Sequence, residues 1–472
     1  MALHDLTLVE VLEGLESGSF SAEELTRALI ARAQHYTDLN AFISFDEDQI
    51  LDDARAADAR RAAGDGGPLV GAPLVLKDNI DIAGRVTTGG TNALRHNVAK
   101  RTAPVAQRLL DAGAVVFGKA NLHELAFGCT SNNGCFGPAR NPYDPDRIAG
   151  GSSGGTASAV GARLAPAGIG SDTGGSVRIP AGFCGNAGLR PTTDRYPAGG
   201  VVPISRSRDT AGPMARSVAD VRLLDAVMAG RDTDQTPLPN LSDIRIGVPR
   251  TLFFETLDRS IATGAEAMLD RFKSYGITLV EADIPDVEAE HKAGNFSVLL
   301  YEAVVDLNAY LAANETGLDF AAVVAEVGSP DVSQILEPLL GDGAIDEAAY
   351  REAMTVHRPR LQKIYADYFK AHRLDAVVYP TVPVLPMLID QPQSGEMEDG
   401  DTVPAINLFD RNTGPASNAG IPSLTIPAGV DAQGLPLSFT LDAPMGADDA
   451  LLALGVALEA VEPETPAPQL AW

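Results

Sequence analysis

The sequence predicts an α/β fold built as one continuous domain. Two observations lead to this prediction. Short apolar runs that are typical of strands alternate with longer segments in which apolar residues recur every three or four positions. No internal repeat, low-complexity tract or linker interrupts this alternation, so we expect a single domain over residues 1–472.

The N-terminal segment is predicted to be mainly helical. Residues 6–35 are typical of two helices, and Ser21 with Glu24 forms a capping box at the start of the second one. Residues 41–44 are expected to form a short strand and residues 47–63 an exposed helix.

An apolar run then ends in a lysine, Lys77. If residues 74–76 form a central strand, Lys77 is poorly solvated, which lowers the pKa of its amine and lets it act as a neutral base. The alternative is a lysine at the end of a strand whose ammonium group reaches water. The local sequence leaves both interpretations open.

The middle of the chain continues the α/β rhythm. We expect helices and strands in the order helix 102–112, strand 115–119, loop 131–149, helix 156–164, strand 165–170 and short helix 179–188.

The C-terminal half follows the same pattern but varies more in composition. The expected helices are 215–230, 261–275, most of 295–370, and 448–461; the expected strands are 244–249, 277–280, 375–380, 423–427 and 437–441; residues 388–404 are expected to form a polar loop. Residues 295–410 are predicted to form a helical cap that covers the site and carries substrate specificity.

Composition excludes several classes of partner. The formal net charge is −27 and the isoelectric point is about 4.5, which disfavours binding to nucleic acid or to an anionic membrane. The sequence shows neither a signal peptide nor an apolar run of transmembrane length. Three cysteines without metal-binding spacing are typical of a reduced cytoplasm, which is the predicted location.

Two serines framed by glycines dominate the motif pattern. Ser152 lies in the sequence GGSSGGT at 150–156, and Ser176 ends the sequence GSDTGGS at 170–176. Glycines allow backbone angles that a Cβ atom forbids and let another group approach closely. A nucleophile whose substrate lies against main-chain N–H groups needs this property.

Other interpretations of these motifs lack a necessary part. Residues 150–154 match G-x-S-x-G, but a loop precedes them where an α/β-hydrolase elbow requires a strand. The DTG sequence at 172–174 has no second copy, which an aspartic protease requires. A phosphate-binding loop would end in Gly-Lys-Ser/Thr. His123 and Glu124 lack the second histidine of a helical metal site.

The remaining chemistry is a serine nucleophile that a lysine base serves through a second serine. In this respect the chain resembles the amidase signature family. The resemblance rests on Lys77, Ser152 and Ser176 and on the glycine-rich sequences around the two serines. Four flanking sequences match as well: KDN at 77–79, FGP at 136–138, NP at 141–142 and DTAGP at 209–213. The resemblance is dense over residues 70–230 and weak over 230–375. Asp194 departs from it, because glycine is expected there.

The resemblance implies a fold, α/β with a large mixed β-sheet flanked by helices, and a catalytic mechanism. Ser176 would be the nucleophile, Ser152 the relay on a cis peptide bond, and Lys77 the base. The backbone N–H groups of Thr173, Gly174, Gly175 and Ser176 would form the oxyanion hole. Asp172 and Arg178 would orient the nucleophile loop. No metal and no organic cofactor is implied.

The resemblance also suggests substrates. Residues 188–205 are similar to the subgroup that includes indoleacetamide and mandelamide hydrolases, so we expect an amidase that acts on small carboxamides, with an acyl pocket to which Cys129 and Thr130 contribute. The alternatives are a hydrolase of carbamates, ureas or anilides, the amidase subunit of a tRNA-dependent amidotransferase, and a non-catalytic amide-binding protein. The expected partner is a small amide, and a homodimer is left open.

Overall fold

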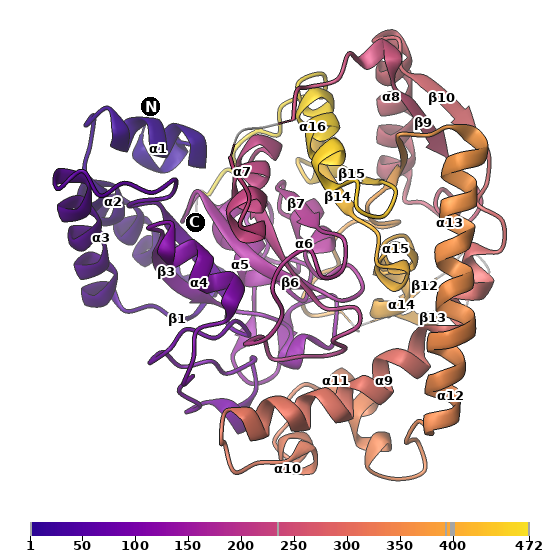
Figure 1. The fold of residues 1–472 in the computed structure, drawn as a ribbon, viewed down its shortest axis with the longest axis horizontal. Helices are drawn as coiled ribbons and strands as arrows, with labels where there is room; N and C mark the ends of the chain where they lie inside the picture. The colour runs from indigo at the N-terminus through magenta and orange to yellow at the C-terminus, as the bar shows by residue number, and fades with distance from the viewer. Residues whose placement is uncertain (1, 234–235, 392–393, 397–401, 471–472) are drawn as a thin grey trace.

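A large mixed sheet runs through the molecule (Figure 1). The computed structural model describes residues 2–233, 236–391, 394–396 and 402–470, and eleven strands of this sheet lie in those ranges. In spatial order they are β1 (Phe42–Ser44), β3 (Val115–Ala120), β2 (Pro73–Lys77), β6 (Ala167–Asp172), β8 (Thr210–Ala215), β7 (Ala187–Arg190), β14 (Ser423–Val430), β15 (Pro436–Asp442), β11 (Ala376–Pro380), β9 (Arg245–Val248) and β10 (Thr278–Glu281).

The helices flank this sheet, which confirms the predicted fold class of a single domain with a mixed sheet (Figure 1). They are α1 (Leu8–Glu16), α2 (Ala22–His35), α3 (Glu47–Ala62), α4 (Pro104–Asp111), α5 (Gly154–Gly161), α6 (Arg178–Phe183), α7 (Val218–Ala229), α8 (Arg259–Ser274), α9 (Val287–Ala313), α10 (Phe320–Val324), α11 (Pro330–Leu336), α12 (Glu347–Glu352), α13 (Arg358–His372), α14 (Ala405–Phe409), α15 (Gly414–Ala419) and α16 (Asp448–Glu459).

The parallel direction of β2 and β6 determines where Lys77 lies. β2 runs parallel to β6, with Leu76 opposite Ile169. Because the carboxyl ends of parallel strands meet at the same edge of a sheet, Lys77 at the end of β2 contacts Ser171 near the end of β6. The end of β2 thus places Lys77 next to the loop that carries Ser176.

The hydrophobic core lies on both faces of the sheet. Leu74 and Leu76 pack in the cluster that includes α4, α7, α8 and α16, whereas Val75 packs in the cluster that includes α2, α3 and α5. Since side chains alternate along a strand, Lys77 is on the same face as Val75. This face is the one that α5 covers, and α5 begins directly after Ser153.

Hydrogen bonds at the helix starts agree with the sequence. The Ser21 hydroxyl accepts a hydrogen bond from the Glu24 amide, and the Glu24 carboxylate accepts one from the Ser21 amide, so the predicted capping box is confirmed. Thr7 and Glu10 form a second box at the start of α1, which the sequence analysis did not identify.

Two central strands were not predicted. The predicted helix 179–188 ends at Phe183, and β7 and β8 follow where no strand was expected. The sequence of β8, TAGPMA, contains one β-branched residue and a proline, which is disfavoured in central strands. Pairing with neighbours on both sides, with Pro213 opposite Ile169, overrides this weak local preference.

Two short two-stranded sheets also differ from the predicted loops. β4 (Asn132–Asn133) pairs with β5 (Gly137–Pro138) inside the expected loop 131–149, and β12 (Ser394–Glu396) pairs with β13 (Thr402–Pro404) inside the expected loop 388–404. The strands are two or three residues long, too short for a periodic pattern to show in the sequence.

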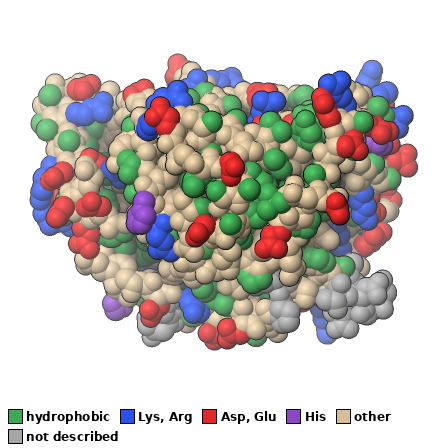
Figure 2. All heavy atoms as spheres, turned by 90° about the horizontal axis from the view of Figure 1, so that it is seen from below, with side chains coloured by type: hydrophobic (Ala, Val, Ile, Leu, Met, Phe, Trp, Pro, Cys, Tyr) green, Lys and Arg blue, Asp and Glu red, His purple; other side chains and the backbone are tan. Residues whose placement is uncertain are grey.

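Helix α9 is long and apolar enough to cross a membrane by length and composition alone, with a mean hydropathy of 1.3 in its best window. Its polar side chains show a different environment. Glu302, Asp306 and Tyr310 are buried and hydrogen-bond to other parts of the fold. From below, the molecule shows a central group of hydrophobic side chains with charged side chains spread around it (Figure 2). One face of α9 is therefore buried in the fold, while the other face is exposed.

The segment 295–410 combines two structural roles. It contains most of α9 and all of α10–α13, in accord with the predicted helical content. It also contains β11, which belongs to the main sheet between β15 and β9. The segment is therefore continuous with the sheet rather than a separate layer.

Candidate active site

Lys77 is fully buried at the end of β2. Its Nζ atom lies 2.7 Å from Ser152 Oγ and 2.8 Å from Ser171 Oγ. Burial lowers the pKa of the Lys77 amine to about 7, against the opposing charges of Asp172 and Asp209. Of the two interpretations that the sequence left open, the buried lysine is the one that the structure shows.

Ser152 follows a cis peptide bond from Gly151, as the family resemblance implied. A methyl group placed on Gly151 would lie 2.9 Å from backbone atoms of residues 129–131, so only glycine fits there. The Ser152 carbonyl accepts hydrogen bonds from the His123 amide and from the Ser131 hydroxyl. These contacts hold the serine with its side chain toward Lys77.

Ser176 lies in the loop between β6 and α6 and is 7% exposed. Its carbonyl accepts a hydrogen bond of 3.1 Å from the amide of Ser153. A second link joins the same two segments, because Ser153 Oγ lies 3.2 Å from the carbonyl oxygen of Ser171. The structure therefore brings the segments of Ser152 and Ser176 together beside Lys77.

The backbone of the nucleophile loop presents free donors. Within the described residues, the amide groups of Gly174, Gly175 and Ser176 donate no hydrogen bond. Gly175 has φ +150°, and a methyl group there would lie 2.2 Å from Thr413 Oγ1. Thr413 in turn donates a hydrogen bond to the Gly174 carbonyl. The loop is thus fixed from one side while its N–H groups stay available to a ligand.

Buried ion pairs close the base of this loop. The Asp172 carboxylate accepts two hydrogen bonds from Arg178, at 3.1 and 3.0 Å, and one from Arg190 at 3.2 Å. It also accepts a hydrogen bond from the Val177 amide. Burial alone would raise the pKa of Asp172, but the two guanidinium groups hold it well below its usual range. Asp172 and Arg178 thus connect the two ends of the loop, the structural role that the sequence analysis gave them.

Thr173 is anchored from the opposite side. Its hydroxyl donates a 2.5 Å hydrogen bond to Asp209, whose other oxygen accepts from the amides of Ile204 and Ser205. Burial raises the pKa of Asp209 to about 6. The Ser205 hydroxyl in turn donates to Glu302 of α9. Helix α9 is thereby connected to the loop that carries Ser176.

Open space lies in front of Gly174. A methyl group placed on this residue would have two described neighbours within 4 Å, Asp410 Oδ2 at 3.8 Å and Arg208 Nη2 at 4.0 Å. Burial raises the pKa of the Asp410 carboxyl to about 7, with Arg208 opposing the shift. His291 borders the same region, 3.0 Å from a methyl group placed on Gly414. The space beside the loop is therefore polar.

Cys129 and Thr130 contribute mainly backbone to the site. Their main-chain atoms pack on Gly151, and the Cys129 side chain lies in an apolar cluster with Phe183 and Phe409. The Thr130 hydroxyl lies 3.3 Å from His123 Nδ1. His123, considered as a metal ligand and rejected, instead accepts a hydrogen bond from the Ser131 amide and lies 3.0 Å from Asp331 through its other ring nitrogen.

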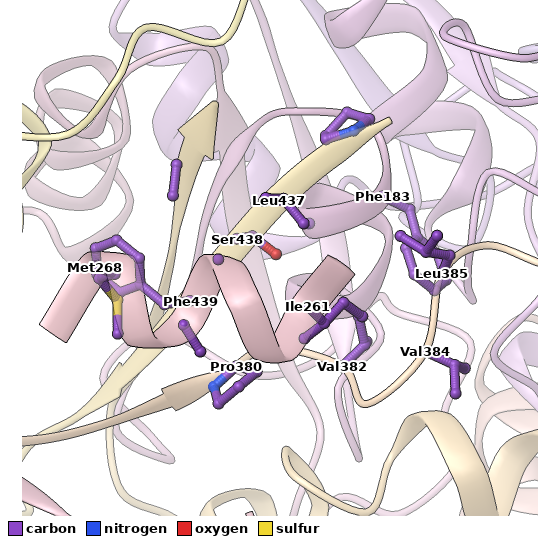
Figure 3. Close-up of a pocket in the computed structure, with 15 residues that line it drawn as sticks. Phe183, Ile261, Met268, Pro380, Val382, Val384, Leu385, Leu437, Ser438 and Phe439 are labelled. Carbon is purple, nitrogen blue, oxygen red and sulfur yellow. The ribbon is translucent and has the colours of Figure 1, made fainter. Parts of the chain in front are cut away.

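An apolar cavity of about 30 Å³ lies elsewhere, between α8 and β15 (Figure 3). Ile261 and Met268 of α8 face Leu437 and Phe439 of β15 across it. Neither Lys77 nor the two serines lines it. It has room for about one water molecule, which is too little for a substrate.

Comparisons with known proteins identify the family to which the chain belongs. The family model described as amidase matches residues 24–452. The chain belongs to the amidase family. It is 41% identical to the indoleacetamide hydrolase of Agrobacterium vitis, over 96% of each chain, and 38% identical to the mandelamide hydrolase of Pseudomonas putida, over 99% of this chain and 93% of the relative. The solved peptide amidase of Stenotrophomonas maltophilia is 30% identical, with a TM-score of 0.85 over 99% of each chain.

Membership in the amidase family makes the chain an amidohydrolase, the enzyme class that the sequence predicted. The sequence analysis missed several residues that complete the site. Ser171 and Asn79 bind one another at 2.9 Å, and Ser171 also binds Lys77. Ser171 lies inside the GSDTGGS sequence. The parallel pairing of Leu76 with Ile169 brings the residues that follow each of them close together, which is why Ser171 reaches Lys77. Asp410 and Arg208 gave no signal, because only the fold brings them to Gly174.

The buried Asp172–Arg178 pair should be essential for stability. Arg178→Met removes two hydrogen bonds from a fully buried carboxylate, and we expect a loss of about 3–5 kcal/mol in the free energy of unfolding. Urea denaturation followed by circular dichroism measures this loss. Arg351→Met, which removes an exposed pair with Glu347, is the control and should leave the midpoint nearly unchanged. Equal midpoints for the two variants would contradict the anchoring role.

Proposed function

We propose that this amidase hydrolyses the C–N bond of small carboxamides to a carboxylic acid and ammonia, with Ser176 as nucleophile, Ser152 as relay and Lys77 as base. One observation carries the proposal. A fully buried lysine with a pKa of about 7 contacts Ser152, and the loop that carries Ser176 is tied to the segment of Ser152. A lysine that is neutral near pH 7 can accept a proton.

The first half-reaction forms an acyl-enzyme. Ser176 Oγ attacks the carbonyl carbon of the amide while its proton passes to Ser152, and Ser152 passes its own proton to Lys77. The oxyanion that forms is stabilised by the backbone amides of Thr173, Gly174, Gly175 and Ser176. The C–N bond then breaks, and the departing nitrogen takes a proton back through Ser152.

The second half-reaction releases the acid. Water attacks the ester carbon and gives a proton to Ser152, which relays it to Lys77. The Ser176–acyl bond breaks, and Ser176 takes a proton back. The residues therefore return to their starting protonation states, and every proton moves along the same path in both halves.

The substrate class is inferred from the relatives and the space beside Gly174. Relatives named indoleacetamide hydrolase and mandelamide hydrolase match 96% or more of this chain. Asp410 and Arg208 border the space where the acyl group would lie, and Cys129 and Thr130 support the wall behind Gly151. From these relatives we propose aryl-acetamide substrates, with residues 295–410 supplying part of the pocket wall.

Three alternative functions share the same chemistry or fold. A carbamate, urea or anilide hydrolase would use the same residues with another leaving group. An amidotransferase subunit would need partner chains, and a non-catalytic amide-binding protein would form no covalent intermediate. The arrangement of Lys77 beside Ser152 favours a catalytic role over the last alternative.

A substrate panel tests the proposed function. Indole-3-acetamide, mandelamide, phenylacetamide, acetamide, phenyl carbamate and acetanilide are compared by release of ammonia or amine from the isolated chain. We expect the aryl-acetamide members to have the highest kcat/KM. A preference for the carbamate or anilide would favour the first alternative, and no turnover of any member would overturn the proposal.

Replacement of the nucleophile should abolish turnover. We expect Ser176→Ala to lower kcat by about 10⁴-fold or more, because the variant can form no acyl-enzyme. Intact-protein mass spectrometry after treatment with a sulfonyl fluoride checks the same assignment, with a mass increase in the wild type and none in the variant. Ser274→Ala is the control, since Ser274 is exposed at the end of α8, far from the loop that carries Ser176 in the chain, and should label as the wild type does. Labelling of Ser176→Ala would place the nucleophile elsewhere.

The pH dependence should follow the lysine. Protonated Lys77 cannot accept a proton, so kcat/KM should fall below an apparent pKa of about 7 and reach a plateau above it. Because Asp410 titrates in the same range, Asp410→Asn separates the two groups, and we expect the acid limb to persist in this variant. Lys77→Ala should lose about 10²–10⁴-fold in rate. An acid limb that disappears with Asp410→Asn would assign the limb to Asp410.

A further inference from the structure

Three polar side chains reach the space in front of Gly174 from three separate parts of the fold. Arg208 lies in the loop before β8, Asp410 directly follows α14, and His291 belongs to α9. A methyl group placed on Gly174 would lie 3.8 Å from Asp410 Oδ2 and 4.0 Å from Arg208 Nη2. One placed on Gly414 would lie 3.8 Å from the same Asp410 oxygen and 3.0 Å from His291 Nε2. The three side chains therefore converge beside the nucleophile loop.

Arg208 is a buried cation with unused hydrogen-bond donors. The residue is 1% exposed, and its Nη1 donates to the side-chain oxygen of Asn295. Its Nε is buried without a partner, and within the described residues its Nη2 donates no hydrogen bond. Burial lowers the pKa of the guanidinium to about 10, so the group is still charged near neutral pH. A buried charge with free N–H groups is costly, and a ligand atom that accepts a hydrogen bond would offset part of that cost.

Asp410 has a fixed backbone and a free carboxyl group. Its amide donates to the Ile406 carbonyl, and its own carbonyl accepts from the Gly414 amide. In the described part of the chain, no other residue donates a hydrogen bond to the carboxyl group. Burial raises its pKa to about 7, and the more distant charges of Arg208 and Arg178 oppose this shift. Since Arg178 already binds Asp172, the carboxyl group of Asp410 is available to a ligand.

His291 adds polarity to this space without adding charge. Burial lowers the pKa of His291 to about 3, and the charges of Arg208 and Lys292 act in the same direction. The imidazole is therefore neutral at the pH of an assay. The space thus offers both a hydrogen-bond donor, at Arg208, and an acceptor, at Asp410. The carbon atoms of a phenyl or indole ring can use neither.

We propose that Asp410 and Arg208 are specificity-determining residues that bind a hydrogen-bond donor of the acyl group, either a hydroxyl next to the carbonyl carbon or a ring N–H. The inference rests on the proposed function and deepens it, because it states which aryl-acetamides the enzyme prefers. The donor binds Asp410 Oδ2, and the oxygen of a hydroxyl also accepts from Arg208 Nη2. A point beside Gly174 lies 3.8 and 4.0 Å from these two atoms, so an atom slightly nearer would reach both at hydrogen-bond distance.

Two matched pairs of substrates test the preference. Mandelamide differs from phenylacetamide by one hydroxyl, and indole-3-acetamide differs from benzothiophene-3-acetamide by an N–H in place of sulfur. The assays are run at about pH 8.5, where Lys77 and Asp410 are both deprotonated. We expect the donor-bearing member to have the higher kcat/KM by about 10-fold or more in at least one pair, because its donor binds a charged acceptor. The pair that responds identifies the donor as hydroxyl or ring N–H.

Variants of Asp410 assign the preference to this residue. Asp410→Leu removes the acceptor at similar volume, and we expect the ratio of kcat/KM within the responsive pair to fall to about one. Asp410→Asn keeps an acceptor oxygen and should retain part of the preference. Arg411→Met is the control in the same loop, because Arg411 donates instead to the Glu255 carbonyl and to Asn412, and it should keep the wild-type ratio.

The ratio separates selection of the donor from a general loss of activity. If Asp410→Leu lowers kcat/KM equally for both members of the responsive pair, Asp410 supports the loop rather than binds the donor, and the inference is wrong. Circular dichroism checks the fold of the variant; if it is lost, the ratios of Asp410→Asn and of the wild type decide. Equal kcat/KM within both pairs for the wild type overturns this inference alone. A wild-type chain that hydrolyses no carboxamide overturns the proposed function itself.

Discussion

The desolvation of Lys77 is the constraint on which the rest of the site depends. The shift of its pKa from 10.5 to about 7 corresponds to a preference for the neutral amine of about 5 kcal/mol relative to water. A buried amine needs hydrogen-bond partners, and the hydroxyls of Ser152 and Ser171 supply them. The parallel pairing of β2 with β6 makes this possible, because it places a lysine from one strand against the loop that follows the other.

A second constraint, the buried ion pairs of Asp172, keeps the nucleophile loop in place. Asp172 lies close enough to raise the pKa of Lys77, yet its carboxylate is occupied by Arg178 and Arg190. Arg178 also donates hydrogen bonds to the Thr413 carbonyl and the Ser423 hydroxyl, so the same ion pair connects the nucleophile loop to α15 and β14. Stability of the C-terminal strands and geometry of the loop therefore depend on one buried cluster.

The sequence predicted the parts of this molecule whose signals are local. Lys77, Ser152 and Ser176 stand in short motifs, and the capping box at Ser21 needs four consecutive residues. β8 could not be predicted in this way, because its alanines, glycine and proline form a strand only between two neighbours. Asp410 and Arg208 are more than 200 residues apart in the chain, and their meeting at Gly174 follows from packing that no local pattern records.

Helix α9 contacts the site through residues on successive turns. Its Glu302 receives hydrogen bonds from Ser205 and Ser207, and this loop leads to Asp209 and so to Thr173. Its next turns carry Asp306 and Tyr310 to a cavity of about 530 Å³ that Ser171 and Asp209 also line. One helix thus holds the loop that would bind the oxyanion and also forms part of the cavity wall beside Ser171.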